Sequence, residues 1–162
     1  AQTACRDPSA FARHDEGMHA NADDEPAPRP LGVVAAVIVA DGRVLACRRA
    51  PHKAPAGSWE FPGGKVEPGE SAPDSLVREI REELSVEITV GRLLDRSTTV
   101  VGGRPIDLSC YLAALAGAPP ARSTDHDRLE WLSVPHLSGL EWSAPDLPAV
   151  QALIELGAPG LH

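Results

Sequence analysis

The chain has 162 residues, a length typical of one domain, and 43% of them are hydrophobic, which suffices for a folded core. The formal net charge of −8 argues against a protein that binds nucleic acid, because such proteins present a basic surface to the phosphates. Since the chain has neither an apolar run near the ~20 residues of a membrane span nor a signal-peptide pattern, we expect no membrane partner and a cytoplasmic location.

Residues 1–30 differ from the rest because they are rich in acidic residues and proline and show almost no apolar periodicity. We expect a disordered or loosely ordered tail here, followed by one domain over residues 31–162. Met18 is the only methionine, so we expect the natural start there, with residues 1–17 upstream of it. The intact mass of the protein from its native host would test this expectation.

The domain is expected to begin with short strands. The predicted strands of this part are residues 33–39, 44–48 and 59–61. Asp41-Gly42 is typical of a hairpin turn between the first two strands, and Pro62-Gly63-Gly64 ends the third. Residues 52–58 contain proline and glycine and are predicted to form a loop.

A helix is predicted over residues 72–84. Ser71 is a favourable N-cap, and Asp74 stands three residues later, as in a capping box. Four apolar residues recur at helical spacing and predict the buried face: Leu76, Val77, Ile80 and Leu84.

The remainder predicts further strands and a second helix. The strands are residues 87–94, 97–101, 106–114 and 129–134, with a loop over 116–127. The last helix covers residues 147–156, and its inward-facing residues are predicted to be Leu147, Val150, Ile154 and Leu153. This order favours an α/β fold in which a mixed sheet carries a helix on each side. The three cysteines (Cys5, Cys47 and Cys110) lie far apart, which argues against a disulfide framework or a zinc site.

Three carboxylates, Glu79, Glu82 and Glu83, share one face of the predicted helix. They repel one another and lie at the helix end whose dipole disfavours anions. A hard divalent cation such as Mg²⁺ would offset these costs, because it prefers oxygen ligands. A solvated acidic face is the alternative interpretation.

From Gly64 onward, GKVEPGESAPDSLVREIREELSV resembles the Nudix box, G-x5-E-x7-R-E-U-x-E-E-x-G-U, where U is a bulky aliphatic residue. The matching residues are Gly64, Glu70, Arg78, Glu79, Ile80, Glu82, Glu83 and Val86. Ser85 replaces a glycine, and we expect a left-handed conformation there at a cost of about 1 kcal/mol. The stretch WEFPGGKVEPGE is similar to the MutT and CTP pyrophosphohydrolase branch of this family. The resemblance covers residues 33–156 and implies the Nudix α/β/α sandwich with a mixed central sheet.

The resemblance also implies site residues. The metal ligands would be Glu79, Glu82, Glu83 and the Gly63 carbonyl, with Mg²⁺ as the cofactor and Mn²⁺ as the alternative. The catalytic groups would be Glu82, Glu83, Arg78 and Asp125. Arg78 would orient the carboxylates and Glu70 would support the loop, whereas Asp125 is either part of the metal site or a turn-forming residue.

Four further residues are candidates for substrate binding. Arg49 and Lys65 would hold phosphate, or are exposed charges. Phe61 would stack on the base, or packs in the core. Asp146 would accept a hydrogen bond from the base, such as the N4 amine of cytosine, or cap the last helix, or do both.

Together these features predict a nucleoside triphosphate pyrophosphohydrolase, in which a metal-activated water cleaves a (d)NTP to (d)NMP and pyrophosphate. CTP or dCTP (including 5-methyl-dCTP) and 8-oxo-dGTP are the expected substrates. The alternative is a non-catalytic Nudix-like module that senses a nucleotide, although such modules usually lose box carboxylates. The expected partner is the nucleotide alone, bound by a monomer or a homodimer.

Overall fold

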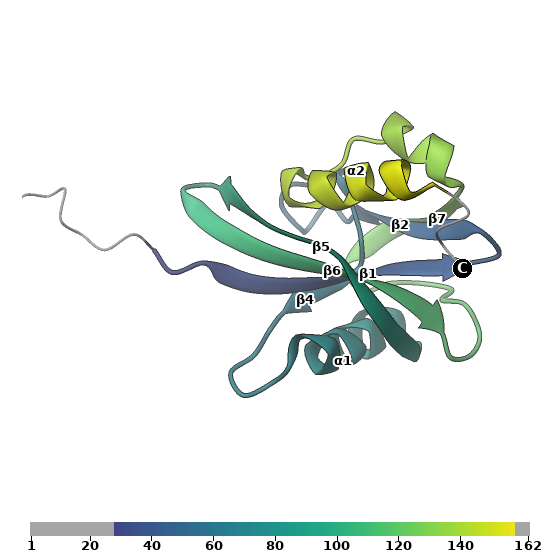
Figure 1. The fold of residues 1–162 in the computed structure, drawn as a ribbon, viewed down its shortest axis with the longest axis horizontal. Coiled ribbons are helices and arrows are strands. Elements are labelled where there is room, and N and C mark those ends of the chain that lie inside the picture. Colours follow the sequence, from purple (N-terminus) through teal and green to yellow (C-terminus); the bar gives the residue numbers. More distant parts are fainter. Residues whose placement is uncertain (1–27, 158–162) are drawn as a thin grey trace, which may run out of the picture.

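The computed structural model describes residues 28–157 (Figure 1). The predictions about Cys5, Met18 and the tail up to residue 27 lie outside the described residues. One sheet forms the middle layer, with α1 (Ala72–Leu84) on one face and α2 (Leu147–Leu156) on the other. Both helices begin and end where the sequence predicts. No helix in the described part of the chain is both long and apolar enough to cross a membrane.

Seven strands make up the sheet. They are β1 (Leu31–Ala40), β2 (Arg43–Arg49), β3 (Trp59–Glu60), β4 (Gly63–Lys65), β5 (Ile88–Val101), β6 (Arg104–Leu115) and β7 (His126–Leu132). Strands β1 and β6 are parallel, whereas β5 pairs antiparallel with β6 and β7 pairs antiparallel with β2. The sheet is therefore mixed, and the predicted α/β/α sandwich is confirmed.

The sheet is split between β1 and β2. These strands pair only next to their turn, where Val39 lies opposite Val44 and Ala40 lies opposite Arg43. Farther along, β4 pairs with β1 and β3 pairs with β2, so that residues 59–65 fill the fork. The Ala36 amide donates to the Pro62 carbonyl at 2.8 Å, which fixes this segment in the fork. β4 was not predicted, because its Gly-Gly sequence has little strand propensity and pairs through backbone groups alone.

Helix α1 matches its prediction in detail. The Asp74 amide donates to the Ser71 hydroxyl at 3.2 Å, which caps the first turn. Leu76, Ile80 and Leu84 are buried against one face of the sheet. At the other end, Ser85 has φ 56° and is left-handed, as expected for the position where the family has glycine.

Helix α2 has a different buried face from the predicted one. Val150 and Leu153 are buried, as is Ala149, but Leu147 and Ile154 are 44% and 40% exposed. The prediction that these last two face inward is wrong. Since successive residues lie 100° apart on a helix, Leu153 lies at the centre of the buried face, with the small Ala149 on one side of it and Val150 on the other. The prediction counted only large apolar residues and left out Ala149, so it placed the buried face too far toward Leu147 and Ile154.

Three other boundaries differ from the prediction. Residues 88–101 form one strand, β5, because register shifts near Leu93 absorb the irregularity without ending the pairing. β7 begins at His126, inside the predicted loop, and stops at Leu132. Val134 instead starts a 3₁₀ helix over Val134–Gly139. Cys47 and Cys110 are free thiols in the core.

Candidate active site

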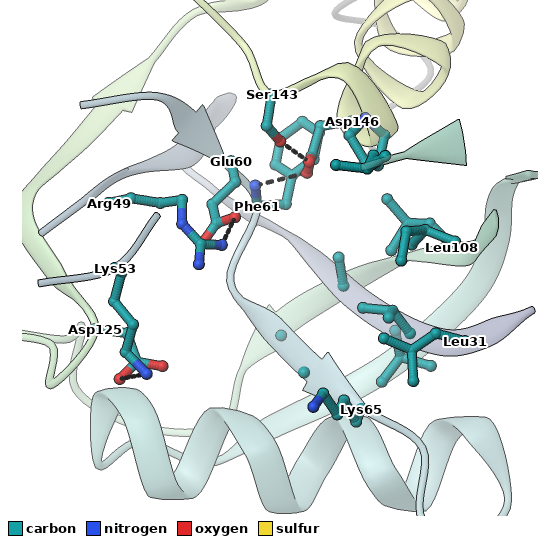
Figure 2. Close-up of a pocket in the computed structure, with 18 of the residues that line it drawn as sticks. Leu31, Arg49, Lys53, Glu60, Phe61, Lys65, Leu108, Asp125, Ser143 and Asp146 are labelled. Carbon is teal, nitrogen blue, oxygen red and sulfur yellow. Dashed lines mark hydrogen bonds and ion pairs between the residues drawn. The ribbon is translucent and has the colours of Figure 1, made fainter. Parts of the chain in front are cut away.

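A cavity of about 570 Å³ opens along the fork between β1 and β2 (Figure 2). It extends from the C-terminal end of α1 to the segment that precedes α2. Seven of the predicted site residues line it: Arg49, Phe61, Gly63, Lys65, Glu83, Asp125 and Asp146. The other three, Arg78, Glu79 and Glu82, lie beside it on α1. Residues far apart in the sequence thus meet at one cavity.

Glu83 is the most unusual group at the α1 end of the cavity. Glu83 is only 8% exposed, and Oε2 of its carboxyl group makes no hydrogen bond. Burial, together with the neighbouring Asp125 carboxyl, raises the pKa of Glu83 to about 10. An acidic oxygen without a donor in such a place requires a proton or a cation.

Arg78 joins α1 to the loop before it. Its Nε and Nη2 donate to the two carboxylate oxygens of Glu70, both at 2.9 Å, and Nη2 also donates to the Lys65 carbonyl at 3.2 Å. Its Nη1 donates to Glu79 at 3.0 Å and to the 60% exposed Glu82 side chain at 3.3 Å. The Arg78 guanidinium holds the pKa of Glu70 low, at about 2, so Glu70 stays ionised as its partner. Arg78 therefore fixes the position of the Glu79 carboxylate relative to β4.

Two neighbouring glycines pack against different groups. A Cβ on Gly63 would lie 1.9 Å from the Val34 carbonyl oxygen. A Cβ on Gly64 would lie 2.2 Å from the carboxyl carbon of Glu79. Gly63 thus allows β4 to approach β1, whereas Gly64 leaves the space that the Glu79 carboxyl occupies.

The donor set at this end fits a hard divalent cation. All candidate ligands are oxygens, they come from Glu79, Glu82, Glu83 and the Gly63 carbonyl, and Oε2 of Glu83 has no protein donor. Within residues 28–157 no three acidic, histidine or cysteine side chains already converge at ligand distances. The reason is that Glu79 and Glu82 turn toward Arg78, so a cation would have to draw them from it.

Asp125 lies beside Glu83 in the lining of the cavity. Its backbone carbonyl accepts from the Ala50 amide at 3.0 Å, and Lys53 Nζ lies 3.6 Å from its carboxylate (Figure 2). The neighbouring Glu83 carboxyl, with Lys53, lowers the pKa of Asp125. Asp125 is therefore the ionised member of this pair at neutral pH. Lys53 was not predicted, because it lies in a loop without a pattern.

Arg49 and Lys65 occupy different positions. Lys65 is exposed on β4, next to the cavity. The Arg49 guanidinium donates to Glu60 at 2.9 Å (Figure 2). The other Glu60 oxygen accepts from Nε2 of the buried His126 at 2.9 Å. Sequence analysis missed this network. Its one signal is a charged residue, Glu60, between the apolar Trp59 and Phe61 in a short strand.

The opposite end of the cavity, lined by Phe61, Ser143 and Asp146, is named here the base end. The Phe61 ring packs on Trp142 with ring centroids 4.7 Å apart. Asp146 is 5% exposed, and its two oxygens accept from the Phe61 amide at 3.0 Å and the Ser143 hydroxyl at 2.5 Å (Figure 2). Asp146 occupies the N-cap position of α2, as the sequence predicts, but its side chain makes no capping hydrogen bond because it accepts from Phe61 and Ser143 instead. Burial raises the pKa of Asp146 to about 7.

Comparison with known proteins places the chain in a family. The NUDIX domain model matches residues 28–153. The CTP pyrophosphohydrolase of Escherichia coli strain K12 is 39% identical over 129 residues, which cover 79% of this chain and 94% of the relative. The putative 8-oxo-dGTP diphosphatase 2 of Mycobacterium tuberculosis is 36% identical over 115 residues, 70% of this chain and 81% of the relative.

A solved structure supports the same family assignment. The solution structure of the E. coli ORF135 protein superposes with a TM-score of 0.69 at 36% identity, covering 80% of this chain and 91% of that one. The family match extends over all seven strands, α1, the first part of α2 and every candidate site residue described above. The chain belongs to the Nudix family and is a Nudix hydrolase.

Proposed function

We propose that this protein hydrolyses a cytosine nucleoside triphosphate, CTP or dCTP (including 5-methyl-dCTP), to the monophosphate and pyrophosphate. One observation carries the proposal: the buried, unpartnered Glu83 oxygen and the Asp146 carboxyl stand at opposite ends of one cavity. A triphosphate with its metal fits the first end, and a base with an amine fits the second. The relative named CTP pyrophosphohydrolase supports this choice of base.

The cofactor in this proposal is Mg²⁺, with Mn²⁺ as the alternative, held by Glu79, Glu82, Glu83 and the Gly63 carbonyl. When bound, the ion supplies Lewis-acid chemistry, which neutralises phosphate oxygens and lowers the pKa of water. Arg78 holds the Glu79 carboxylate in place through a charge-assisted hydrogen bond. The ionised Asp125 carboxylate, or Glu82, accepts the proton of the attacking water.

The remaining residues bind the substrate. Lys53 and Lys65 bring positive charge to the triphosphate, and Arg49 does so from a position fixed by Glu60. The Phe61 ring packs in the core and is only 3% exposed, so its part in the proposal is limited to an apolar contact at the cavity wall. The Asp146 carboxylate accepts from the N4 amine of the base. The carboxylates around the metal repel a bare triphosphate, so binding depends on the cation.

8-Oxo-dGTP is the second candidate substrate. Its oxidised base carries an N–H on the ring nitrogen where guanine has an acceptor, and Asp146 accepts from such a donor as well. The relative named putative 8-oxo-dGTP diphosphatase 2 favours testing it.

Pyrophosphate release from a nucleotide panel tests the proposal. The panel holds CTP, dCTP, 5-methyl-dCTP, 8-oxo-dGTP, dGTP and ADP-ribose, each with Mg²⁺, with Mn²⁺ and with EDTA. We expect metal-dependent release that is fastest with a cytosine nucleotide and is lost in Glu83→Gln. Tight binding of one nucleotide without turnover of any would refute the hydrolase and favour the nucleotide-sensing module.

A further inference from the structure

We infer that Ser143 makes the base end select a 4-amino over a 4-oxo pyrimidine, by holding the Asp146 carboxyl group as a hydrogen-bond acceptor. The inference rests on the proposed function and deepens it, because it names the group that distinguishes accepted from rejected pyrimidine nucleotides. Cytosine presents an amine at this position, whereas uracil presents a carbonyl oxygen.

The backbone fixes Ser143 beside Asp146. The Trp59 amide donates to the Glu141 carbonyl at 2.9 Å, and the Ser143 amide donates to the Trp59 carbonyl at 2.8 Å. Residues 141–143 thus run along Trp59 as a short parallel bridge. Since these bonds use backbone atoms only, the Ser143 hydroxyl remains available, and it donates to Oδ2 of Asp146 at 2.5 Å.

Asp146 receives a second donor from the other side. The Phe61 amide donates to Oδ1 at 3.0 Å, so each carboxylate oxygen has one protein donor (Figure 2). An ionised carboxylate has about four acceptor positions, so about two remain for a ligand. Both remaining positions accept, which suits an N–H of the base and repels a carbonyl oxygen.

The charges around Asp146 are mixed. Arg49 favours its ionised form, and Glu60 opposes it. Two thiols, Cys47 and Cys110, also lie near Asp146. Burial raises their pKa values, so they stay neutral. No single neighbouring charge decides the state of Asp146.

Burial is the largest influence and raises the pKa of Asp146 to about 7, while the hydrogen bonds from Ser143 and Phe61 lower it. The Ser143 hydroxyl therefore keeps more of the acceptor form at neutral pH. Without it, a larger fraction of Asp146 carries a proton. A protonated carboxyl donates, and a donor suits the O4 carbonyl of uracil.

The test is the affinity of the product nucleotides dCMP and dUMP, measured by titration calorimetry with Mg²⁺ for wild type, Ser143→Ala and Ser143→Thr. We expect wild type to prefer dCMP. Ser143→Ala should reduce the dCMP-to-dUMP affinity ratio about tenfold at neutral pH, the size expected of one hydrogen bond to a charged group. Ser143→Thr keeps the hydroxyl and should restore the ratio. As the pH is lowered, the preference for dCMP should disappear at a higher pH in Ser143→Ala than in wild type.

Two results would overturn the inference. One is the absence of a preference for dCMP in wild type. The other is a dCMP-to-dUMP affinity ratio that Ser143→Ala leaves unchanged because both affinities fall equally. The two nucleotides serve as controls for each other, since a misfolded site weakens both. The binding ratio does not depend on turnover. Absence of pyrophosphate release from every triphosphate would refute the proposed function, while the ratio would still decide the role of Ser143.

Discussion

Two buried carboxyl groups line the same cavity, Glu83 at the α1 end and Asp146 at the base end. Glu83 has an oxygen without any donor, whereas both oxygens of Asp146 accept hydrogen bonds from the protein. Burial raises the pKa of both groups, but that of Glu83 rises to about 10 and that of Asp146 to about 7. The α1 end is thus incomplete without a cation, while the base end is already organised to accept hydrogen bonds.

The largest expected effect comes from Glu83→Gln. Hydrolysis should fall by about a thousandfold or more, because a proposed metal ligand is lost. The metal-free variant should nevertheless be more stable than wild type by about 1–3 kcal/mol at neutral pH, since it no longer buries an acid beside the Asp125 carboxyl. Pyrophosphate release and urea unfolding in EDTA measure the two effects. Glu155→Gln, on the exposed surface of α2, is the matched control.

The stability difference between wild type and Glu83→Gln should depend on pH. The folded-state pKa of Glu83, about 10, lies above its ordinary value of 4.5, so folding favours the protonated form. The stability associated with that form is complete below 4.5 and is lost as the pH rises toward about 10. The advantage of Glu83→Gln in EDTA should therefore grow with pH over this range. A constant advantage would contradict the raised pKa of the buried Glu83 carboxyl.

The two glycines separate stability from function at the α1 end. Gly63→Ala should lower the free energy of unfolding by about 3 kcal/mol, because its Cβ meets the Val34 backbone. Gly64→Ala should cost less than about 1 kcal/mol, because it meets only the end of a side chain, but it displaces the Glu79 carboxyl. We expect it to lower kcat/KM about a hundredfold. Thermal unfolding and steady-state kinetics of both variants test this; equal stability losses would contradict it.

Asp146→Asn tests the base end. The amide keeps the size of the carboxyl but offers fewer acceptors, so kcat/KM for dCTP should fall about 10- to 100-fold. Because the wild-type group has a pKa of about 7, its preference for dCTP over dUTP should weaken as the pH falls below that value. In Asp146→Asn the preference should no longer change near pH 7. A variant that keeps the wild-type pH profile would show that another group reads the base.

The smallest effect is expected for Ser85→Gly, just past α1. Ser85 is left-handed with φ 56°, so glycine should raise the free energy of unfolding by about 1 kcal/mol. Neither end of the cavity involves this side chain. Urea unfolding should show the gain, and kcat/KM for dCTP should stay at the wild-type value; a loss of activity would mean that this turn positions Glu83.

The sequence predicts what local patterns determine. The N-cap at Ser71, the apolar stripe of α1 and the left-handed Ser85 all follow from neighbours within a few residues, and all three are confirmed. The box carboxylates are likewise visible because their spacing is helical. The buried face of α2 was predicted wrongly. It includes the small Ala149, and the sequence alone does not show how closely this residue approaches the sheet.

Contacts across the chain were not predictable. The amide of Phe61 meets a carboxylate 85 residues later, and His126 meets Glu60 across 66 residues. In the sequence, Asp146 has every property of a helix N-cap, and only the fold shows that its side chain turns toward Phe61 and Ser143. Tertiary contacts thus decide between two uses of the same residue.

The bridge between Trp59 and residues 141–143 has an evolutionary consequence. Because its two hydrogen bonds join backbone atoms, side chains at positions 141 and 143 can change without loss of the connection. The residues proposed to hold the metal lie on α1 and β4, which this segment does not form. Lineages of such enzymes can therefore acquire new nucleotide preferences by point mutation here while inheriting the hydrolytic machinery unaltered.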